Sequence, residues 1–407
     1  MKKLYLGIKM SKLNKIFYGP AGTGKTRKAI EEAVRIVNNS MSSVLNLNNY
    51  DKVLESFQSF SNLAKLQNKL NNKNLILKLQ DSSIDIQGIL DDDTNEGQLK
   101  YLTNGTFDKP KAKKAIEEYR AKNLKYPFIE TVTFHPSYAY QDFVEGISVE
   151  TTQNGQIKYI VKDGIFKKIC DRAIENSNYN YVLIIDEINR GDISSIFGEL
   201  FTLLEDTKRV NNKEVKNNEA MSINLPYSKD NKGNPKKLTV PSNLYIVATM
   251  NTVDKSIALI DVALRRRFEF EECMPQYNLK EFDKCKIIDL SKLLSTLNKR
   301  ISILKNEHYQ IGHSYFLKVT TLKELHDVMK KSIIPLLQEY FYDDWKSICA
   351  ILNQSYSNPK DNKILISQQE NKNLFKSEFN DLTEYQNKKI FKLNAKLSAQ
   401  DIKSIYE

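Results

Sequence analysis

Short apolar runs that end in polar residues recur along the first two thirds of the chain. Runs of this kind cover residues 16–18, 181–185 and 244–249, and a helix is expected to follow the first run after a glycine-rich stretch at 19–26. A strand of a parallel sheet reads as a continuous apolar run, because both of its faces are covered. The pattern therefore predicts an α/β fold, in which helices flank a parallel sheet.

The last third of the chain has a different pattern. Apolar residues recur at three- and four-residue spacing over residues 290–304 and 322–345, which is typical of helices that bury one face. We therefore expect an α/β core over residues 1–274, and a helical part with a C-terminal element over residues 275–407. A segment at about 40–126, with helical stretches and roughly balanced charge, is expected to be an insertion in the core.

Two stretches between the predicted strands contain turn residues. Residues 134–166 predict a short helix and then a β-hairpin, whose turn holds Asn154 and Gly155, a strong signal for a two-residue turn. Residues 209–240 end in a lysine-rich stretch with Gly and Pro, where we expect a mobile loop.

The first apolar run leads directly into the pattern of a phosphate-binding loop. Residues 13–30 read LNKIFYGPAGTGKTRKAI, so Gly-x-x-x-x-Gly-Lys-Thr stands between a predicted strand and a predicted helix. Glycines let backbone N–H groups turn toward phosphate oxygens, and the helix N-terminus adds partial positive charge. Lys25 would reach the β- and γ-phosphates, and Thr26 would offer its hydroxyl to Mg²⁺. The expected nucleotide-binding residues are Gly19, Pro20, Ala21, Gly22, Thr23, Gly24, Lys25 and Thr26.

The two later apolar runs end in polar residues that suit the same chemistry. Asp186 and Glu187 close the run at 181–185, and Asn251 follows the run at 244–249. Ligands bind beyond the C-terminal ends of strands in open α/β sheets, so these side chains are expected to share one site with the loop. Asp186 would hold Mg²⁺, Glu187 would polarise the attacking water, and Asn251 would hydrogen-bond that water and the γ-phosphate.

Composition adds three limits. No apolar run approaches the roughly 18–20 residues that cross a bilayer, so we expect a cytoplasmic protein without a membrane partner. The formal net charge of +11 allows contact with nucleic acid, although scattered lysines explain it equally well. Four cysteines stand far apart with no CxxC pair, which favours reduced thiols over disulfides or a zinc site, and a metal is expected only together with a ligand.

Six segments together resemble the AAA+ module of the McrB family, the motor subunits of McrBC modification-dependent restriction systems. They read GPAGTGKT, FHPSYAYQDFVEGI, DGIFKKIC, IIDEINRGDISSIFGELFTLLEDTKR, MNTVDKSIALIDVALRRRF and IGHSYF. The resemblance covers about 13–40 and 130–350, and it implies an AAA+ P-loop core with a C-terminal helical lid. It also implies a hexameric ring, a separate McrC-like endonuclease subunit, and DNA as a partner, directly or through the complex.

The resemblance further implies hydrolysis of GTP with Mg²⁺ in restriction or phage defence. The loop contacts phosphates and not the base, so ATP stays open, as in AAA+ remodelling proteins of the MoxR kind. A nucleotide-dependent assembly scaffold that hardly hydrolyses is the other alternative. Glu187 and Asn251 argue against it, because a protein that only binds nucleotide needs neither residue.

The resemblance carries one more segment of site residues to this chain. Asn251, Thr252 and Asp254 match the family's signature segment, so Asp254 is expected to act beside Asn251 in catalysis. Val253 and Lys255 stand where Ala and Arg are more usual. The change to Lys255 loses the planar, bidentate recognition that an arginine provides.

Three consecutive arginines, at positions 265–267, end an apolar segment. Adjacent helix positions point in different directions, so the three side chains cannot all serve one solvated face. In AAA+ rings a neighbouring subunit presents an arginine to the γ-phosphate, which can raise the rate by roughly 10³–10⁵. The resemblance implies this role for Arg265 or Arg266, with Arg190 as another candidate.

Other residues near these motifs have two readings each. Arg267 is expected to pair with Glu269, Glu271 or a helix C-terminus. His313 and Ser314 are expected to begin or support a lid helix facing the nucleotide, and a purely structural His313 is equally compatible. The predicted hairpin either reaches into the pore of a ring or lies on its rim.

The chain departs from the family pattern in two places. The phosphate loop starts close to residue 1, so we expect the separate DNA-reading domain of full-length relatives to be absent. The segment at 40–126 is longer than the connection expected there. We interpret it as an element that docks a partner or recognises a target, or as an addition on the rim of the ring without such a role.

Overall fold

A computed structural model describes most of the chain, in nine segments. They are residues 13–40, 109–110, 128–151, 155–177, 179–210, 219–253, 262–342, 344–367 and 389–407. Almost all of the predicted insertion at 40–126 therefore lies outside the described residues. The chain divides into two compact units: unit 1 holds residues 1–16, 26–249 and 257–270, and unit 2 holds residues 17–25, 250–256 and 271–407.

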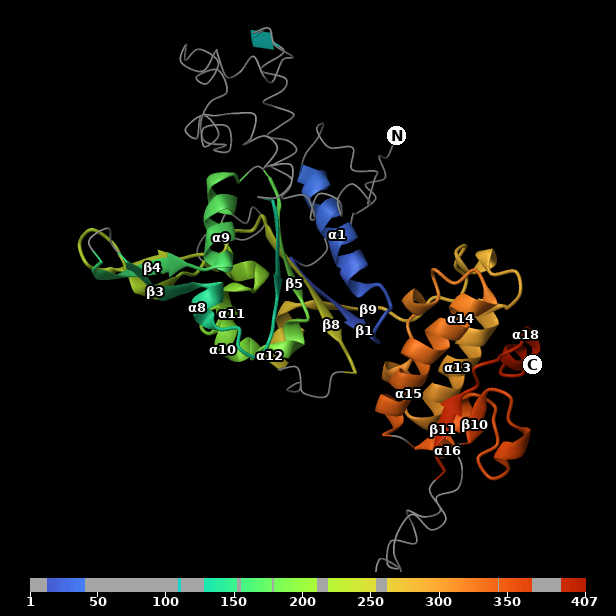
Figure 1. Cartoon of the computed structure of the whole chain (residues 1–407). Helices are drawn as coiled ribbons and strands as arrows, with labels where there is room; N and C mark the ends of the chain where they lie inside the picture. The colour runs from blue at the N-terminus through green and yellow to red at the C-terminus, as the bar shows by residue number, and fades with distance from the viewer. Residues whose placement is uncertain are drawn as a thin grey trace, which may run out of the picture. The chain divides into compact units, whose positions relative to one another are not determined.

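A five-stranded sheet forms the centre of the α/β part, with the strand order β2-β5-β8-β1-β9. Strand β5 runs parallel to both of its neighbours, β2 and β8. Helices lie around the sheet, among them α1 and α9 (Figure 1). The bounds are β1 Asn14–Gly19, β2 Ile129–Thr133, β5 Tyr181–Asp186, β8 Leu244–Asn251, β9 Glu269–Glu272, α1 Lys25–Ser40, α8 Tyr140–Phe143, α9 Ile165–Glu175, α10 Ile193–Phe197, α11 Leu200–Leu203 and α12 Val262–Arg267. The predicted α/β fold class is confirmed.

Burial explains why the apolar runs became the central strands. The first five residues of β5 are all buried, as expected for a strand covered on both faces.

A buried arginine connects the starts of two neighbouring strands, β1 and β8. Arg209 is 1% exposed, and it donates to the carbonyl oxygen of Leu244 and to Asn14 Oδ1, both at 2.6 Å. Burial lowers the pKa of Arg209 to about 10, so the guanidinium still carries its charge at neutral pH.

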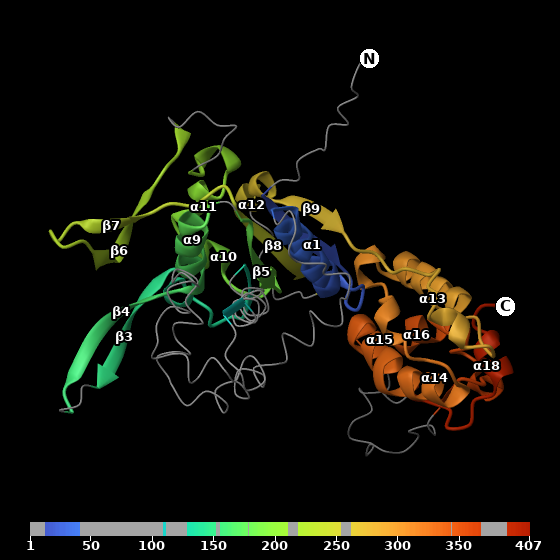
Figure 2. The ribbon, with the colours of Figure 1, turned by 90° about the horizontal axis from the view of Figure 1, so that it is seen from above.

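Two β-hairpins extend from unit 1 on the same side of the sheet (Figure 2). One pairs β3 (Glu145–Thr151) with β4 (Ile157–Asp163), and the other pairs β6 (Ile223–Lys229) with β7 (Pro235–Leu238). The second hairpin corrects the predicted mobile loop at 209–240. Its turn is held by Asp230, whose carboxylate accepts the backbone N–H groups of Lys232 (2.8 Å) and Asn234 (2.9 Å).

The hairpin β3–β4 differs from its predicted turn and exposes an apolar face. Its last pair, Thr151 with Ile157, leaves five residues between the strands, of which 152–154 lie outside the described residues, so the predicted two-residue turn is wrong. Cross-strand pairing places Val149 beside Tyr159 on one face. These side chains are 56% and 72% exposed, so this face meets solvent in the chain as described.

Unit 2 is built around a helical core. Helix α13 supplies one apolar face, with Leu293, Leu294, Leu297 and Ile301 fully buried. The predicted helix over 322–345 is interrupted, because a π-helical turn separates α14 from α15 and Tyr342 adopts a left-handed conformation. The bounds are α13 Leu290–Leu304, α14 Leu322–Val328, η8 Met329–Ile333, α15 Ile334–Phe341, α16 Trp345–Ile351, β10 Leu365–Ser367, β11 Phe391–Leu393 and α18 Ala399–Lys403.

Two further observations bear on the sequence-based expectations. Within the described segments, no helix is both long and apolar enough to span a bilayer. The four cysteines are all buried and carry free thiols. Burial raises the pKa of Cys349 to about 11, so this thiol stays protonated at neutral pH.

Candidate functional site

The predicted phosphate loop lies where strand β1 turns into helix α1. Strand β1 ends at Gly19 and α1 begins at Lys25. Gly22 has a φ of +76°, a conformation that glycine adopts without strain. Lys25 Nζ donates to the carbonyl oxygens of Gly19 (3.0 Å) and Pro20 (2.6 Å), and Thr23 Oγ1 donates to the latter at 2.9 Å. The loop, with Ala21 and Gly24 at its turn, therefore holds its lysine ammonium inward.

The segment 311–316 of the helical part packs directly against this loop. Ser314 donates its backbone N–H to the carbonyl oxygen of Gly22 at 3.0 Å. A Cβ on Gly312 would lie only 2.1 Å from the carbonyl carbon of Gly22, so no side chain fits there. The predicted lid residues His313 and Ser314 thus form a 3₁₀ turn, His313–Tyr315, against the loop, rather than the start of a longer helix.

His313 has a defined hydrogen-bonding state within this contact. Its Nδ1 accepts the backbone N–H of Gln276 at 3.1 Å, so the neutral imidazole carries its proton on Nε2. That Nε2 lies 3.8 Å from the position of a Cβ on Gly24. The histidine therefore supports the packing between segment 311–316 and the phosphate loop.

The predicted polar sensor lies at the end of β8. Asn251 is the last residue of this strand, which continues two residues past the predicted run at 244–249, so it does not lie just past the strand end as predicted. Thr252 donates its backbone N–H to the carbonyl oxygen of Gly19 at 3.1 Å, which links the strand end to the phosphate loop. Asp254, the other residue predicted from this segment, lies outside the described residues.

The acid pair lies at the end of β5. The parallel register sets Ile185 beside Ala248, so Asp186 comes next to Thr249. Asp186 Oδ1 accepts two hydroxyl groups, from Thr249 at 2.5 Å and from Thr26 at 3.1 Å. The aspartate is therefore fixed by one hydroxyl from the sheet and one from the phosphate-loop helix.

Glu187 is held in a conformation that most residues avoid. Its φ of +52° and ψ of +48° are left-handed, which costs a residue with a side chain on the order of 1–3 kcal/mol. Its backbone N–H donates to Thr249 Oγ1 at 3.1 Å, and its Oε2 lies 3.7 Å from Arg190 Nε. Strained backbone of this kind clusters at functional sites, which fits the role predicted for Glu187.

Thr26 and Asp186 are suitable ligands for Mg²⁺. Hydroxyl and carboxylate oxygens are the hard donors that this ion prefers, and it is usually held by one or two carboxylates together with substrate phosphates. No group of three or more His, Cys, Asp or Glu side chains that could hold a metal ion occurs within the segments described above. The residues thus fit an ion that arrives with a phosphate ligand.

The three consecutive arginines have three different environments. Arg267 donates to Glu205 at 2.6 Å and lies 5.8 Å from the centre of the Phe201 ring. This glutamate, 62 residues away, was not among the partners predicted for Arg267, which were Glu269, Glu271 or a helix C-terminus. Arg265 is exposed, with its guanidinium 5.5 Å from the centre of the Phe270 ring.

The third arginine, Arg266, is also exposed. Helix α12 thus directs one arginine into its own unit and leaves two on the surface. We predicted that Arg267 is structural and that Arg265 or Arg266 reaches the nucleotide of a neighbouring subunit. The exposure of the three side chains is compatible with this assignment, and the catalytic role of Arg265 or Arg266 stays a prediction.

One residue of the acid cluster was missed by the sequence analysis. Thr249 bonds both Asp186 and the backbone of Glu187, and it lies within a run that was taken as merely apolar. The signal in the sequence was a hydroxyl residue in an otherwise apolar strand, two positions before Asn251. Residues two apart on a strand share a face, so Thr249 and Asn251 point the same way.

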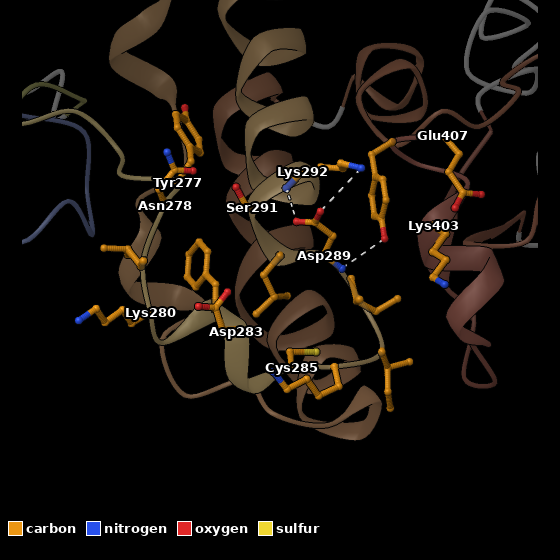
Figure 3. A pocket seen from close by; sticks show the side chains of 17 residues that line it. Tyr277, Asn278, Lys280, Asp283, Cys285, Asp289, Ser291, Lys292, Lys403 and Glu407 are labelled. Atoms are coloured by element: carbon orange, nitrogen blue, oxygen red, sulfur yellow. Dashed lines mark hydrogen bonds and ion pairs between the residues drawn. The ribbon is translucent and has the colours of Figure 1, made fainter.

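A separate cavity of about 880 Å³ lies in unit 2, at the start of α13 (Figure 3). Lysines and acids line it together, and Lys292 lies 3.9 Å from Asp289. The cavity has no single sign of charge, and none of the predicted site residues lines it. It is therefore not part of the predicted site.

The structure groups the predicted residues in two clusters, each described within its own unit. In unit 1, Thr26 and Glu187 meet Asp186 directly or through Thr249. In unit 2, the loop residues 19–25 contact the segment after Asn251 and the turn at His313.

Comparisons with known families match both parts of the chain. The family model described as the AAA domain of the dynein-related subfamily matches residues 111–268. The family model described as the McrB α-helical lid domain matches residues 289–349. The phosphate loop at residues 19–26 lies outside both matches.

Two curated proteins are similar over about half of this chain. The type IV methyl-directed restriction enzyme EcoKMcrB subunit of Escherichia coli K12 is 36% identical over 234 residues, which cover 53% of this chain and 48% of that protein. The type II restriction enzyme BsuMI component YdiS of Bacillus subtilis 168 is 27% identical over 248 residues, which cover 52% of this chain and 70% of that protein. The chain thus spans about half the length of the E. coli relative.

Proposed function

We propose that this chain, which is an McrB-like AAA+ protein, hydrolyses GTP with Mg²⁺ as the motor of a restriction complex. The observation that carries the proposal is the contact of Thr26 Oγ1 with Asp186 Oδ1 at 3.1 Å. It joins the last residue of the phosphate loop to the aspartate that ends β5. That pair is the arrangement expected of oxygen ligands for the Mg²⁺ of a bound triphosphate.

The proposed chemistry assigns each residue one task. Backbone N–H groups of residues 19–26 and the Lys25 ammonium bind the phosphates, and Thr26 and Asp186 hold Mg²⁺. When bound, the ion neutralises charge on the phosphate oxygens. Glu187 accepts the proton of the water that attacks the γ-phosphorus.

Five further residues are candidates for roles around this reaction. Asn251 orients the attacking water, with Asp254 beside it. Arg265 or Arg266, or alternatively Arg190, stabilises the developing charge from a neighbouring subunit, which is worth roughly 10³–10⁵ in rate. The exposure of Arg265 and Arg266 supports this part of the proposal.

The preference for GTP rests on the resemblance to the McrB family alone. Its test is hydrolysis of GTP and ATP at equal concentrations, with Mg²⁺ and with EDTA. We expect Mg²⁺-dependent turnover, faster with GTP. A preference for ATP would instead support the MoxR-like remodelling protein, and tight binding with hardly any turnover would support the assembly scaffold.

The proposed partners are a hexameric ring of this chain, a McrC-like endonuclease subunit, and DNA, bound directly or through the complex. The names of both relatives describe parts of multi-component restriction enzymes, which supports a partner subunit. Sizing chromatography with and without GTP tests the ring. Turnover measured with and without the product of the neighbouring gene tests the partner, and an unchanged rate and unchanged size with that product would count against it.

A further inference from the structure

A single buried hydroxyl group connects the two acids at the end of β5. Thr249 is 1% exposed and lies on the neighbouring strand β8. Its Oγ1 is 2.5 Å from Asp186 Oδ1 and 3.1 Å from the backbone nitrogen of Glu187.

The direction of both hydrogen bonds follows from chemistry. A backbone N–H can only donate, so Thr249 Oγ1 accepts from Glu187. The hydroxyl has one proton, and the remaining neighbour is a carboxylate oxygen that accepts when ionised. Thr249 therefore donates its only proton to Asp186, and its rotation is fixed by the two contacts together.

These contacts fix the carboxylate orientation of Asp186 and the backbone conformation of Glu187, and both acids need this geometry for their proposed roles. Asp186 must present an oxygen in one orientation, and donation from Thr249 to Oδ1 fixes the plane of its carboxylate. Glu187 must keep a left-handed backbone, with φ of +52°, and the bond to its N–H stabilises that conformation. Hydrogen bonds of this kind orient metal-binding carboxylates, and their loss typically costs about 10–100-fold in metal affinity or activity.

We infer that Thr249 is a positioning residue, which orients Asp186 toward Mg²⁺ and fixes the backbone from which Glu187 reaches the attacking water. This inference rests on the proposed function, since it assumes a Mg²⁺–nucleotide ligand. A purely structural threonine would act only through packing, and then its methyl group would matter as much as its hydroxyl.

The two roles are separated by a matched pair of variants in the full chain. Thr249→Ser and Thr249→Ala both remove the methyl group, and only Thr249→Ser keeps the hydroxyl. Thr131→Val, on the exposed face of β2, is the control for changing a threonine of the same sheet. The measurements are the melting temperature without nucleotide, the binding of a fluorescent GTP analogue in a Mg²⁺ titration and in EDTA, and the rate of turnover.

For Thr249→Ala we expect the half-saturating Mg²⁺ concentration to rise and turnover to fall by about 10–100-fold. Binding of the analogue in EDTA should be unchanged, because the phosphate loop is intact. Thr249→Ser should stay close to the wild-type protein in every measurement, and Thr131→Val should match it.

Two results would overturn the inference. One is a Thr249→Ala protein with wild-type Mg²⁺ dependence and turnover. The other is a Thr249→Ser protein that loses as much as Thr249→Ala, which would make the role one of packing. If the wild-type protein binds the analogue with Mg²⁺ but does not hydrolyse it, the proposed hydrolysis fails while the Mg²⁺ titration still decides the role of Thr249. If it shows no Mg²⁺-dependent binding, both proposals fail.

Discussion

The two polar clusters are built by different means. In unit 1, the acid cluster consists of side chains that bond to one another, with Asp186 Oδ1 receiving the hydroxyls of Thr26 and Thr249. In unit 2, the phosphate loop is shaped by backbone contacts, where Ser314 donates its N–H to Gly22 and Gly312 packs too closely for a side chain. The acid cluster therefore depends on the functional groups of its side chains, and the loop cluster depends on the shape of its backbone.

This difference predicts which property each cluster controls. A change of one functional group in the acid cluster leaves the backbone in place, so it should alter the chemistry and spare nucleotide binding. A side chain added in the loop cluster must displace backbone, so it should weaken binding first. The following variants test that division.

The largest effect is expected from the exposed arginines of α12. Arg265→Ala or Arg266→Ala should lower turnover by about 10³–10⁵-fold in at least one case, because the charge that develops in the transition state loses its positive partner. Nucleotide affinity should hardly change. Steady-state hydrolysis and binding of a fluorescent analogue, both in assembled protein, measure the two quantities.

Replacement by lysine at the same position is the control for this experiment. Lysine keeps the charge and loses the planar fork, so Arg265→Lys or Arg266→Lys should recover only part of the rate. Wild-type turnover in both alanine variants of an assembled ring would remove these arginines from the reaction.

Glu187→Gln should lower turnover by about 10²–10⁴-fold, the usual contribution of a general base. Affinity for nucleotide with Mg²⁺ should stay near the wild-type value, since the variant removes a proton acceptor and adds no volume. Glu175→Gln, on the exposed face of α9, is the matched control. An equal loss of affinity in Glu187→Gln would break the proposed division between chemistry and binding.

Gly312→Ala should weaken nucleotide binding, because its Cβ would lie 2.1 Å from the carbonyl carbon and 2.2 Å from the carbonyl oxygen of Gly22. The φ of Gly312 is an ordinary −69°, so the effect comes from the contact and not from backbone strain. Titration with a fluorescent analogue measures it, and we expect a loss of at least about tenfold, equivalent to 1.4 kcal/mol.

Gly233→Ala is the control for Gly312→Ala. A Cβ there meets nothing within 4 Å, although the φ of +83° strains an alanine. It should leave nucleotide affinity unchanged. If Gly312→Ala binds nucleotide as tightly as this control, the packing of segment 311–316 does not shape the phosphate loop.

The smallest effect is expected from the pair formed by Arg267 and Glu205. Glu205→Gln should lower the free energy of unfolding by about 1 kcal/mol, because the glutamate is partly exposed and water screens the pair. Turnover should be unchanged. Urea denaturation measures the first quantity, and a clear loss of turnover would show that the arginine run acts as a unit.

Much of the fold follows from local patterns. The runs at 181–185 and 244–249 predicted β5 and β8, because a strand covered on both faces must be apolar at every position. The lysine-rich stretch in 209–240 was predicted to be a mobile loop, because its mostly polar residues show no hydrophobic pattern that would indicate strands. Its structure depends on a turn at Asp230 and on pairing of β6 with β7.

For the candidate site, too, contiguous motifs were predicted and contacts between distant residues were not. The loop at 19–26 and the acids Asp186 and Glu187 were placed correctly at strand ends, because each motif is contiguous. Glu205, the partner that the structure shows for Arg267, was not predicted, since it lies 62 residues away. Thr249 was overlooked for a similar reason, because its local signal, a hydroxyl group in an apolar run, does not reveal that its partner is Asp186.

The sequence by itself determined the strands β1, β5 and β8, the glycine-rich loop at 19–26, and the acids and amide at the strand ends, because these depend on residues adjacent in the chain. Only the tertiary structure decided that Thr249 bonds Asp186 across 63 positions, and that Gly312 and Ser314 pack on Gly22. Contacts between distant residues are set by sheet register and by packing of the helical part, which no local pattern records.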